Sequence, residues 1–325
     1  MRAQAYFSAP LRSQAYDSLQ PILATPSFDP DNLVGISARF LENADVYTRT
    51  YTASQHFRER FQKAFKASAI DTSELKHILD MGSGPGTNSI MPLSEIIDGV
   101  HIVASDISLN LLAILAGVLH NYPYRDNIDL VAWDAMSSEE IAAETFDMVT
   151  GASVLHHLMD PTLAYSSAFK ALKPGGRAVF IEPFDGFSLI LGMFKSILAF
   201  NADASRPLSP AAEGYLKMLV LDYEARFAGQ TPADFALLED KWLFTPERMR
   251  DEALAAGFRH CEIQPHYAHD TLYRDYGLMQ LNLAGGEEAT DLPQWALDVF
   301  DSFDRAVPKP AKSRMILEGT AVLTK

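Results

Sequence analysis

Three glycines at alternating positions follow a short apolar run and constrain this chain more than any other feature. The run Ile78–Met81 contains Asp80, and the glycines are Gly82, Gly84 and Gly86. Glycine lets a backbone turn sharply and approach a ligand without a clash at Cβ. The spacing differs from the Gly-x-Gly-x-x-Gly of dinucleotide enzymes, and Asp80 would repel a pyrophosphate. The loop therefore suits a nucleoside-like ligand that carries a positive charge.

Around this loop, short apolar runs alternate with helical stretches, a pattern typical of βαβ units and a parallel sheet. The expected strands are His77–Met81, His101–Ser105, Ile128–Trp133, Phe146–Gly151, Arg177–Glu182, His260–Gln264 and Glu318–Leu323. The expected helices are Ser89–Ile97, Leu109–Asn121, Ser138–Ala143, Pro161–Leu172, Phe187–Phe200, Ala211–Phe227 and Pro246–Ala256.

This order predicts one α/β core domain that is interrupted twice. The core is expected over residues 71–185 and 245–325, after a helical N-terminal cap over residues 1–70. Residues 183–244 and 266–310 are expected to be inserted lid segments. Because ligands of open α/β sheets bind outside the carboxyl ends of the strands, such insertions can cover the substrate.

Two further acids stand at the ends of the next two expected strands. Asp106 lies 20 residues after Gly86, and Asp134 closes the run Leu130–Trp133. An acid at the first of these positions can accept hydrogen bonds from both hydroxyls of a ribose. The second acid could accept a hydrogen bond from an exocyclic adenine amine. Alone, each acid is more often a helix N-cap or a solvated turn, but in register with the glycine loop they indicate a nucleoside site.

The chain resembles the class I S-adenosylmethionine-dependent methyltransferases. Besides the glycine loop, the resemblance rests on Phe146–Val149, Val154–Pro161 and Ala171–Arg177, and it covers residues 75–185, 245–264 and 318–323. It implies a Rossmann-like α/β fold with a seven-stranded, mostly parallel sheet, in which Gly319–Leu323 is the reversed last strand.

The resemblance also implies the cofactor, S-adenosylmethionine, and the residues that hold it. Asp80, Gly82, Gly84 and Gly86 would line the methionine moiety, and the backbone near Ser153 would face its end. Asp106 would hold the ribose, Ile107 would pack on the adenine, and Asp134 and Ala135 would contact the adenine edge. An aromatic residue from the N-terminal region, Tyr47, would lie over the cofactor.

Three residues are candidates for a general base that deprotonates the acceptor. His156 and His157 come just after the fourth expected strand, and Glu182 ends the fifth. The alternative is structural: one histidine packs against the following helix, and Glu182 supports the fold. Because His156 and His157 are adjacent, they cannot share one helix face, and no metal site is predicted.

The predicted activity is methyl transfer to a small-molecule acceptor by in-line displacement. Two alternatives stay open: a protein that binds S-adenosylmethionine or S-adenosylhomocysteine without methylating, and a methyltransferase that acts on proteins. A hydride-transferring oxidoreductase is disfavoured, since its third glycine would stand one residue later.

Charge and composition restrict the partners. With 27 Lys and Arg against 42 Asp and Glu, the formal charge is −15, which disfavours nucleic acids and anionic membranes. No segment approaches the ~20 apolar residues that span a bilayer. The single cysteine, Cys261, precludes an internal disulfide. We therefore expect a cytoplasmic protein, and the sequence is compatible with a homodimer.

Overall fold

The computed structural model describes residues 2–33, 35–36, 41, 44, 48, 54–227, 231–266 and 270–325. The chain divides into two compact units. The first comprises Met1–Glu182, Glu239–Gln264 and Thr320–Lys325, and the second comprises Pro183–Leu238 and Pro265–Gly319.

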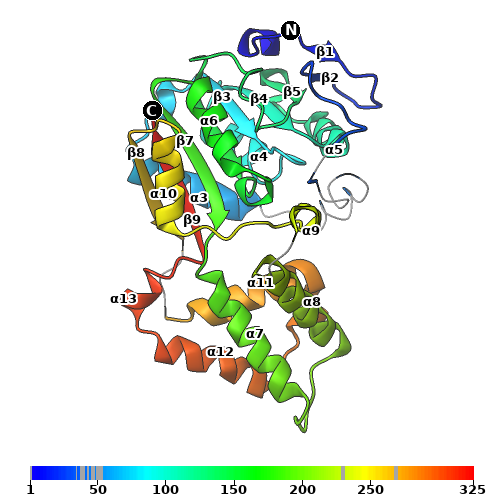
Figure 1. Ribbon diagram of the computed structural model, residues 1–325, viewed down its shortest axis with the longest axis vertical. Helices are drawn as coiled ribbons and strands as arrows, with labels where there is room; N and C mark the ends of the chain where they lie inside the picture. Colours follow the sequence, from blue (N-terminus) through cyan, green and yellow to red (C-terminus); the bar gives the residue numbers. More distant parts are fainter. Residues whose placement is uncertain are drawn as a thin grey trace. The chain divides into compact units, whose positions relative to one another are not determined.

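The first unit is built around a nine-stranded sheet with the order β1-β2-β5-β4-β3-β6-β7-β9-β8. Strands β2, β5, β4, β3, β6 and β7 run parallel to one another (Figure 1). The strands are β1 (Arg12–Ser13), β2 (Ile22–Ala24), β3 (His77–Met81), β4 (His101–Asp106), β5 (Ile128–Ala132), β6 (Phe146–Ala152), β7 (Leu172–Pro183), β8 (His260–Pro265) and β9 (Glu318–Thr324).

Strand β9 runs against the direction of its two neighbours. The N–H of Arg259, next to β8, donates to the carbonyl of Thr324, and the N–H of His266 donates to that of Glu318, so the pairing is antiparallel. The N–H of Lys325 donates to Gly176 of β7 in the same sense. The predicted mostly parallel α/β sheet with a reversed last strand is thus confirmed.

The N-terminal region differs from the helical cap that the sequence predicts. Residues Ile22–Ala24 form β2, which pairs in parallel with β5, and β1 pairs antiparallel with β2. These two strands extend the expected seven-stranded sheet to nine. A helix of this region, α3, is described over Ser54–Ala67.

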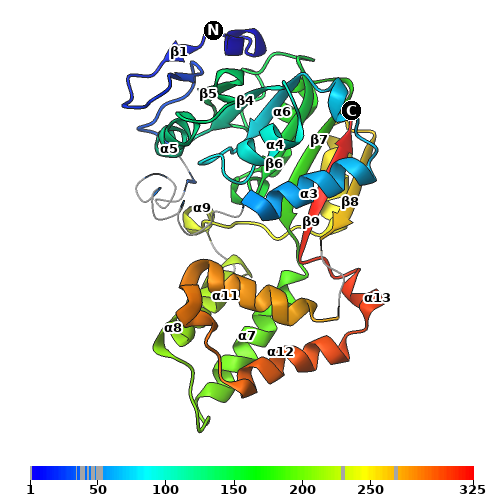
Figure 2. The same cartoon turned by 180° about the vertical axis from the view of Figure 1, so that it is seen from behind.

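Helices cover both faces of this sheet. On one face lie α3, α4 (Ile90–Ile96) and α5 (Leu109–Leu119), whose apolar side chains share one buried cluster with the strands (Figure 2). On the other face lie α6 (Pro161–Ala171) and α10 (Pro246–Ala255), which contact each other (Figure 1). Since both faces are buried, the central strands read as near-continuous apolar runs, and all of β4 is buried.

Side-chain caps fix where the helices begin. The side chain of Ser108 accepts the N–H of Leu111 at the start of α5, and that of Thr245 accepts the N–H of Arg248 at the start of α10. The predicted helix at Ser138–Ala143 is wrong. Ile141 instead forms an isolated antiparallel bridge with Phe7, a long-range contact that local periodicity cannot indicate.

The second unit is helical over its described residues. It contains α7 (Phe187–Asn201), α8 (Pro210–Phe227), α9 (Pro232–Leu237), α11 (Leu272–Thr290), α12 (Gln294–Ala306) and α13 (Lys309–Lys312). Its core includes Phe187 stacked on Tyr223, with ring centroids 4.6 Å apart, and a buried ion pair of 2.6 Å between Lys312 and Asp304.

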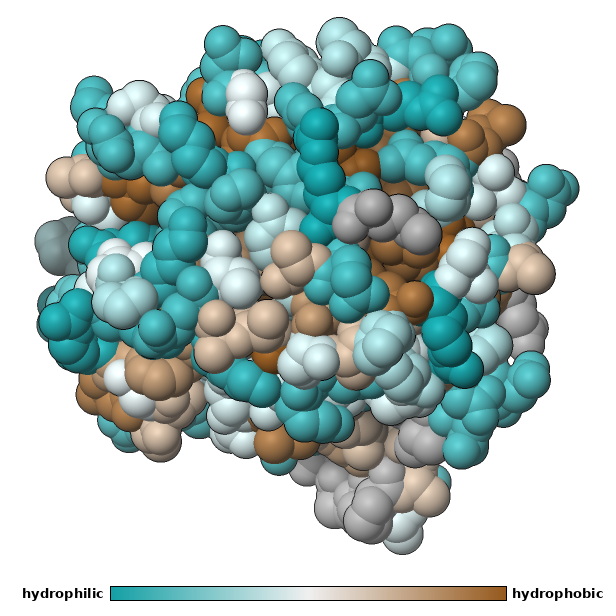
Figure 3. Space-filling model, turned by 90° about the horizontal axis from the view of Figure 1, so that it is seen from above, coloured by the Kyte–Doolittle hydropathy of each residue, from teal (hydrophilic) through white to brown (hydrophobic). Residues whose placement is uncertain are grey.

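Within the described residues, no helix is both long and apolar enough to cross a bilayer. Hydrophilic side chains predominate on the face shown in Figure 3, with smaller apolar patches between them.

Candidate functional site

The glycine loop leaves β3 at the carboxyl edge of the sheet, and its glycines meet different constraints. All three have positive φ, between 52° and 77°. A Cβ on Gly82 would stand 2.3 Å from Val154, and one on Gly86 would stand 2.3 Å from Leu115 of α5. A Cβ on Gly84 would meet no atom within 4 Å. The loop is therefore closely packed at Gly82 and Gly86 and open at Gly84.

Asp106 ties this loop to the end of β4. Its Oδ2 accepts the N–H of Gly84 at 2.8 Å, and its Oδ1 accepts the N–H of Ser108 at 2.8 Å. Burial raises the pKa of Asp106, although these backbone N–H groups oppose the rise. A carboxylate has about four acceptor positions, so Asp106 retains capacity for ligand hydroxyls.

Asp134 follows β5 at the same edge of the sheet. Its Oδ1 accepts the N–H of Met136 at 2.9 Å, and burial raises its pKa. The neighbouring Trp133 is buried and donates its ring N–H to the carbonyl of Ser137. Trp133 and Asp134 therefore form a partly apolar surface that carries one carboxylate.

Ser153, just after β6, adopts the left-handed conformation with φ of 61°. Its N–H donates to the carbonyl of Ile181 at 2.8 Å, which holds this turn against β7. A residue other than glycine in this region stores backbone strain, and such strain concentrates at functional sites.

These strand ends surround one cavity within the first unit. Of the residues that the sequence predicts for the site, Gly82, Gly84, Asp106, Ile107, Asp134, Ala135, Ser153 and His157 line it. The sequence interpretation missed the other lining residues, which include Gly35, Asn88, Leu111, Met136, Leu158, Met159 and Lys241. Leu158 and Met159 lie in the segment Val154–Pro161, which carries the resemblance but gave no role to these two residues. Gly35, Leu111 and Lys241 lie in segments without a motif, and only the fold brings them to this edge.

Asp80 is fully buried beneath the loop instead of lining the cavity. Its Oδ2 accepts hydrogen bonds from Ser83 and Ser89, at 2.6 and 2.7 Å, and its Oδ1 accepts one from Thr150 at 2.6 Å. Burial raises the pKa of Asp80 to about 6 against the effect of these three hydroxyls. In this structure the carboxyl group of Asp80 holds the loop in shape, and Gly86 likewise packs beneath the cavity wall.

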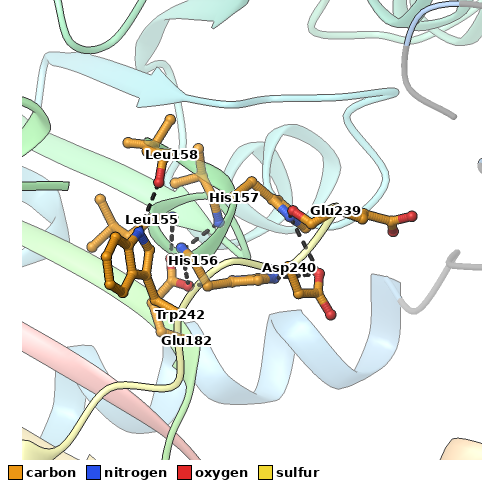
Figure 4. A network of polar contacts seen from close by, with 9 residues as sticks. Leu155, His156, His157, Leu158, Glu182, Glu239, Asp240 and Trp242 are labelled. Carbon is orange, nitrogen blue, oxygen red and sulfur yellow. Dashed lines mark hydrogen bonds and ion pairs between the residues drawn. The ribbon is translucent and has the colours of Figure 1, made fainter. Parts of the chain in front are cut away.

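Glu182 and His156 form a buried pair behind the cavity wall (Figure 4). The Oε2 of Glu182 lies 2.6 Å from Nδ1 of His156, and its Oε1 accepts the N–H groups of Val154 and Leu155 at 3.0 and 2.8 Å. Neither His156 nor Glu182 lines the cavity. Their contacts are those of a support for the turn that follows β6.

The segment Glu239–Trp242 is fastened to the same turn. The N–H groups of Lys241 and Trp242 both donate to the carbonyl of His156, at 2.7 and 3.2 Å. The ring N–H of Trp242 donates to the carbonyl of Leu158 at 2.8 Å (Figure 4). Although burial alone would lower the pKa of His156, the carboxylates of Glu182 and Asp240 raise it to about 9.

His157 differs from its neighbour in both position and charge. It lines the cavity, and its Nδ1 lies 2.9 Å from the carbonyl of Glu239 (Figure 4). Because a carbonyl only accepts, this contact places the ring proton on Nδ1. Burial and the positive charge of His156 lower the pKa of His157 to about 3, so the imidazole is neutral at neutral pH.

Tyr47 lies outside the described residues. Cys261, in β8, is buried, and burial raises its pKa to about 11. This thiol is therefore an inert part of the core, as a small buried hydrophobic residue would be.

Part of the first unit matches a known protein family. Residues 79–178, which run from the glycine loop to β7, match a family model described as a methyltransferase domain. The mostly parallel sheet and the cavity at its carboxyl edge agree with a methyltransferase domain of the class I, S-adenosylmethionine-dependent kind.

Part of the chain is also similar to curated methyltransferases. The chain is 29% identical over 151 residues to a demethylmenaquinone methyltransferase from Clavibacter sepedonicus, covering 45% of this chain and 57% of that protein. It is 32% identical over 108 residues to a ubiquinone biosynthesis O-methyltransferase from Thiobacillus denitrificans, covering 32% of this chain and 43% of that protein. The chain thus spans about half the length of the curated relatives it matches.

Among solved structures, the chain is similar to one described as a putative sarcosine dimethylglycine methyltransferase from Galdieria sulphuraria. The identity is 14%, the TM-score is 0.49, and the match covers 83% of this chain and 86% of that one. It also resembles phosphoethanolamine N-methyltransferase 2 from Haemonchus contortus, with 17% identity, a TM-score of 0.48, and coverage of 81% and 51%.

Proposed function

We propose that this protein binds S-adenosylmethionine and transfers its methyl group to a small-molecule acceptor. The observation that carries the proposal is the cavity in which the open position at Gly84 and the carboxylates of Asp106 and Asp134 converge. These groups fit a ribose and an adenine better than a phosphate, since two acids would repel phosphate oxygens.

Different residues of the cavity would contact different parts of the cofactor. The backbone of Gly82 and Gly84 would receive the methionine moiety, with Ser153 at its far end. Asp106 would accept hydrogen bonds from the ribose hydroxyls, while Ile107 would cover the adenine. Asp134 and Ala135 would contact the adenine edge.

When bound, S-adenosylmethionine supplies a methyl group that is already activated on a sulfonium. The chain's own residues then have to position the acceptor, exclude water and accept a proton where the acceptor releases one. Among the three predicted bases, His157 suits this last task best, because it lines the cavity as a neutral imidazole. We assign His156 and Glu182 to positioning, because their contacts hold the turn that carries His157.

A small acceptor agrees with the relatives, whose names refer to demethylmenaquinone and to ubiquinone biosynthesis. The substrate-covering role of residues 183–244 and 266–310 stays a prediction from the sequence. So do the cytoplasmic location, the lack of nucleic-acid and membrane partners, and the compatibility with a homodimer.

The proposal is tested by incubating the protein with S-adenosylmethionine and a panel of small phenols, hydroquinones and amines. The readout is S-adenosylhomocysteine formed above the rate without acceptor. We expect at least one acceptor to give product, with the rate lowered in His157→Gln. Tight cofactor binding without product from small molecules or proteins would instead favour the non-methylating alternative.

A further inference from the structure

Two adjacent histidines and a distant aspartate meet at one point beside the cavity. His156 and His157 occupy a single 3-10 turn, and their ring centroids lie 3.9 Å apart. One nitrogen of each ring and one oxygen of Asp240 all lie within 4.8 Å of one another. The sequence interpretation expected the rings to diverge, but the tight turn and the segment at Asp240 bring them together.

We propose that His156, His157 and Asp240 bind one divalent transition-metal ion such as Zn²⁺. Imidazole nitrogens and carboxylate oxygens are the ligands that zinc takes in proteins, and catalytic zinc sites use three such protein ligands. The ion would replace the proton between Nε2 of His156 and Asp240, and the proton on Nδ1 of His157.

The separations of the three ligand atoms fit an ion better than direct ion pairs. The Oδ1 of Asp240 lies 3.4 Å from Nε2 of His156 and 3.3 Å from Nδ1 of His157. A charge-assisted hydrogen bond between such atoms is usually about 2.7–2.9 Å long. Two ligands that are each about 2.1 Å from a tetrahedral zinc ion lie about 3.4 Å apart.

A second carboxylate stands where metal-binding histidines usually have one. Nδ1 of His156 lies 2.6 Å from Glu182, so Nε2 faces Asp240 in a fixed orientation (Figure 4). A carboxylate on the far nitrogen orients the ring and makes it a stronger ligand. Glu182 is fully buried, and its other oxygen is held by two backbone N–H groups, so this arrangement is rigid.

The charges around the cluster also favour a cation. The carboxylates of Glu182 and Asp240 flank the two rings, against the nearby ammonium group of Lys241. Of the three ligands only His157 lines the cavity, so an ion bound here would adjoin that wall. Any contact of the ion with an acceptor rests on the proposed function, whereas the site itself does not.

The test uses the full chain without a histidine tag, stripped with a chelator and then titrated with Co²⁺. We expect uptake of one equivalent with the intense visible absorption of a four-coordinate Co²⁺ ion, and its displacement by Zn²⁺. Asp240→Asn and His157→Gln should weaken binding by at least the roughly 10–100-fold that loss of a second-shell partner costs. His120→Gln, which changes an exposed histidine, is the matched control and should bind like the wild type.

Thermal unfolding of each variant, compared with the wild type, shows whether the fold is retained. Lack of uptake by the wild type, or equal uptake by folded Asp240→Asn and His157→Gln, would overturn the proposal. Binding of S-adenosylhomocysteine is measured separately on the same samples. A metal site without cofactor binding would contradict the proposed function alone, and cofactor binding without a metal site would contradict this inference alone.

Discussion

The N–H of Gly84 donates to Oδ2 of Asp106 across 2.8 Å, so the glycine loop and the end of β4 are one structural piece. A substitution of Asp106 therefore changes the position of the glycine loop as well as the contact between residue 106 and a ligand. Substitutions around this bond therefore separate residues that shape the cavity from residues that face it.

Two neighbouring glycines should respond differently to alanine. In Gly82→Ala the new methyl group meets Val154, so we expect a loss of about 2–5 kcal/mol from strained φ and overpacking. In Gly84→Ala the methyl group meets open space beside the cavity, which costs about 1–2 kcal/mol for the backbone alone. Urea unfolding measures both losses.

Although Gly84→Ala should cost less stability than Gly82→Ala, it should impair binding of the cofactor. We expect Gly84→Ala to weaken binding of S-adenosylhomocysteine about tenfold or more, which is about 1.4 kcal/mol. An alanine variant at Gly84 that binds as tightly as the wild type would contradict the close approach of the ligand to this position.

Asp80 should make stability depend on pH in an unusual direction for an aspartate. Its pKa is raised from 3.8 to about 6 in the folded protein, so the folded state binds more protons than the unfolded state between these values. Its contribution to stability is therefore complete below its unfolded pKa and is lost as the pH rises through about 6.

Asp80→Asn removes this titration and keeps a polar side chain of the same shape. From about pH 4 to about pH 7, the unfolding free energy of the wild type should fall by roughly 2 kcal/mol relative to this variant. Urea unfolding of both proteins across this range gives the difference. A difference that does not vary with pH would contradict the buried position of the carboxyl group.

Glu182→Ala should lower stability more than a surface change does. It leaves three backbone N–H groups and the ring of His156 without their carboxylate, and breaking such a buried pair costs about 3–5 kcal/mol. Asp160→Ala, which removes an exposed N-cap, is the control and should cost about 1 kcal/mol. Equal unfolding midpoints for the two variants would argue against a supporting role for Glu182.

Cys261 should resist thiol reagents while the protein is folded. It is 3% exposed and its pKa is raised to about 11, so little reactive thiolate forms. At about pH 8, we expect modification with a disulfide reagent to be roughly a hundredfold slower than for a free thiol, and to become fast in urea. Rapid modification of the native protein would show that β8 opens readily.

The parts of the fold that were predictable are those with a local signal. The strands that lead to Asp80, Asp106 and Asp134 are buried on both faces, so each appears in the sequence as an apolar run before an acid. Strand β2 gave no such signal, because it has three residues in a segment punctuated by prolines. Only its pairing with β5 makes Ile22–Ala24 a strand.

The residues of the candidate site were likewise predictable only where they belong to a local sequence pattern. Residues at or just after the end of a strand, such as Asp106 and Gly84, could be placed from their spacing. The partners of His156 could not, because Asp240 stands in an irregular segment 84 positions later in the chain. Its approach to His156 depends on the hydrogen bonds of Lys241 and Trp242, which are tertiary contacts without a sequence motif.

Calorimetry with S-adenosylhomocysteine measures whether the cavity binds an adenosine-based sulfonium cofactor. We expect micromolar binding to the wild type and none for NADH. Asp106→Ala should lose about 100-fold in affinity, since hydrogen bonds to a charged group contribute roughly 1.5–3 kcal/mol each. A folded wild-type protein that binds no S-adenosylhomocysteine, or an Asp106→Ala variant that binds it equally well, would rule out this cofactor in the cavity.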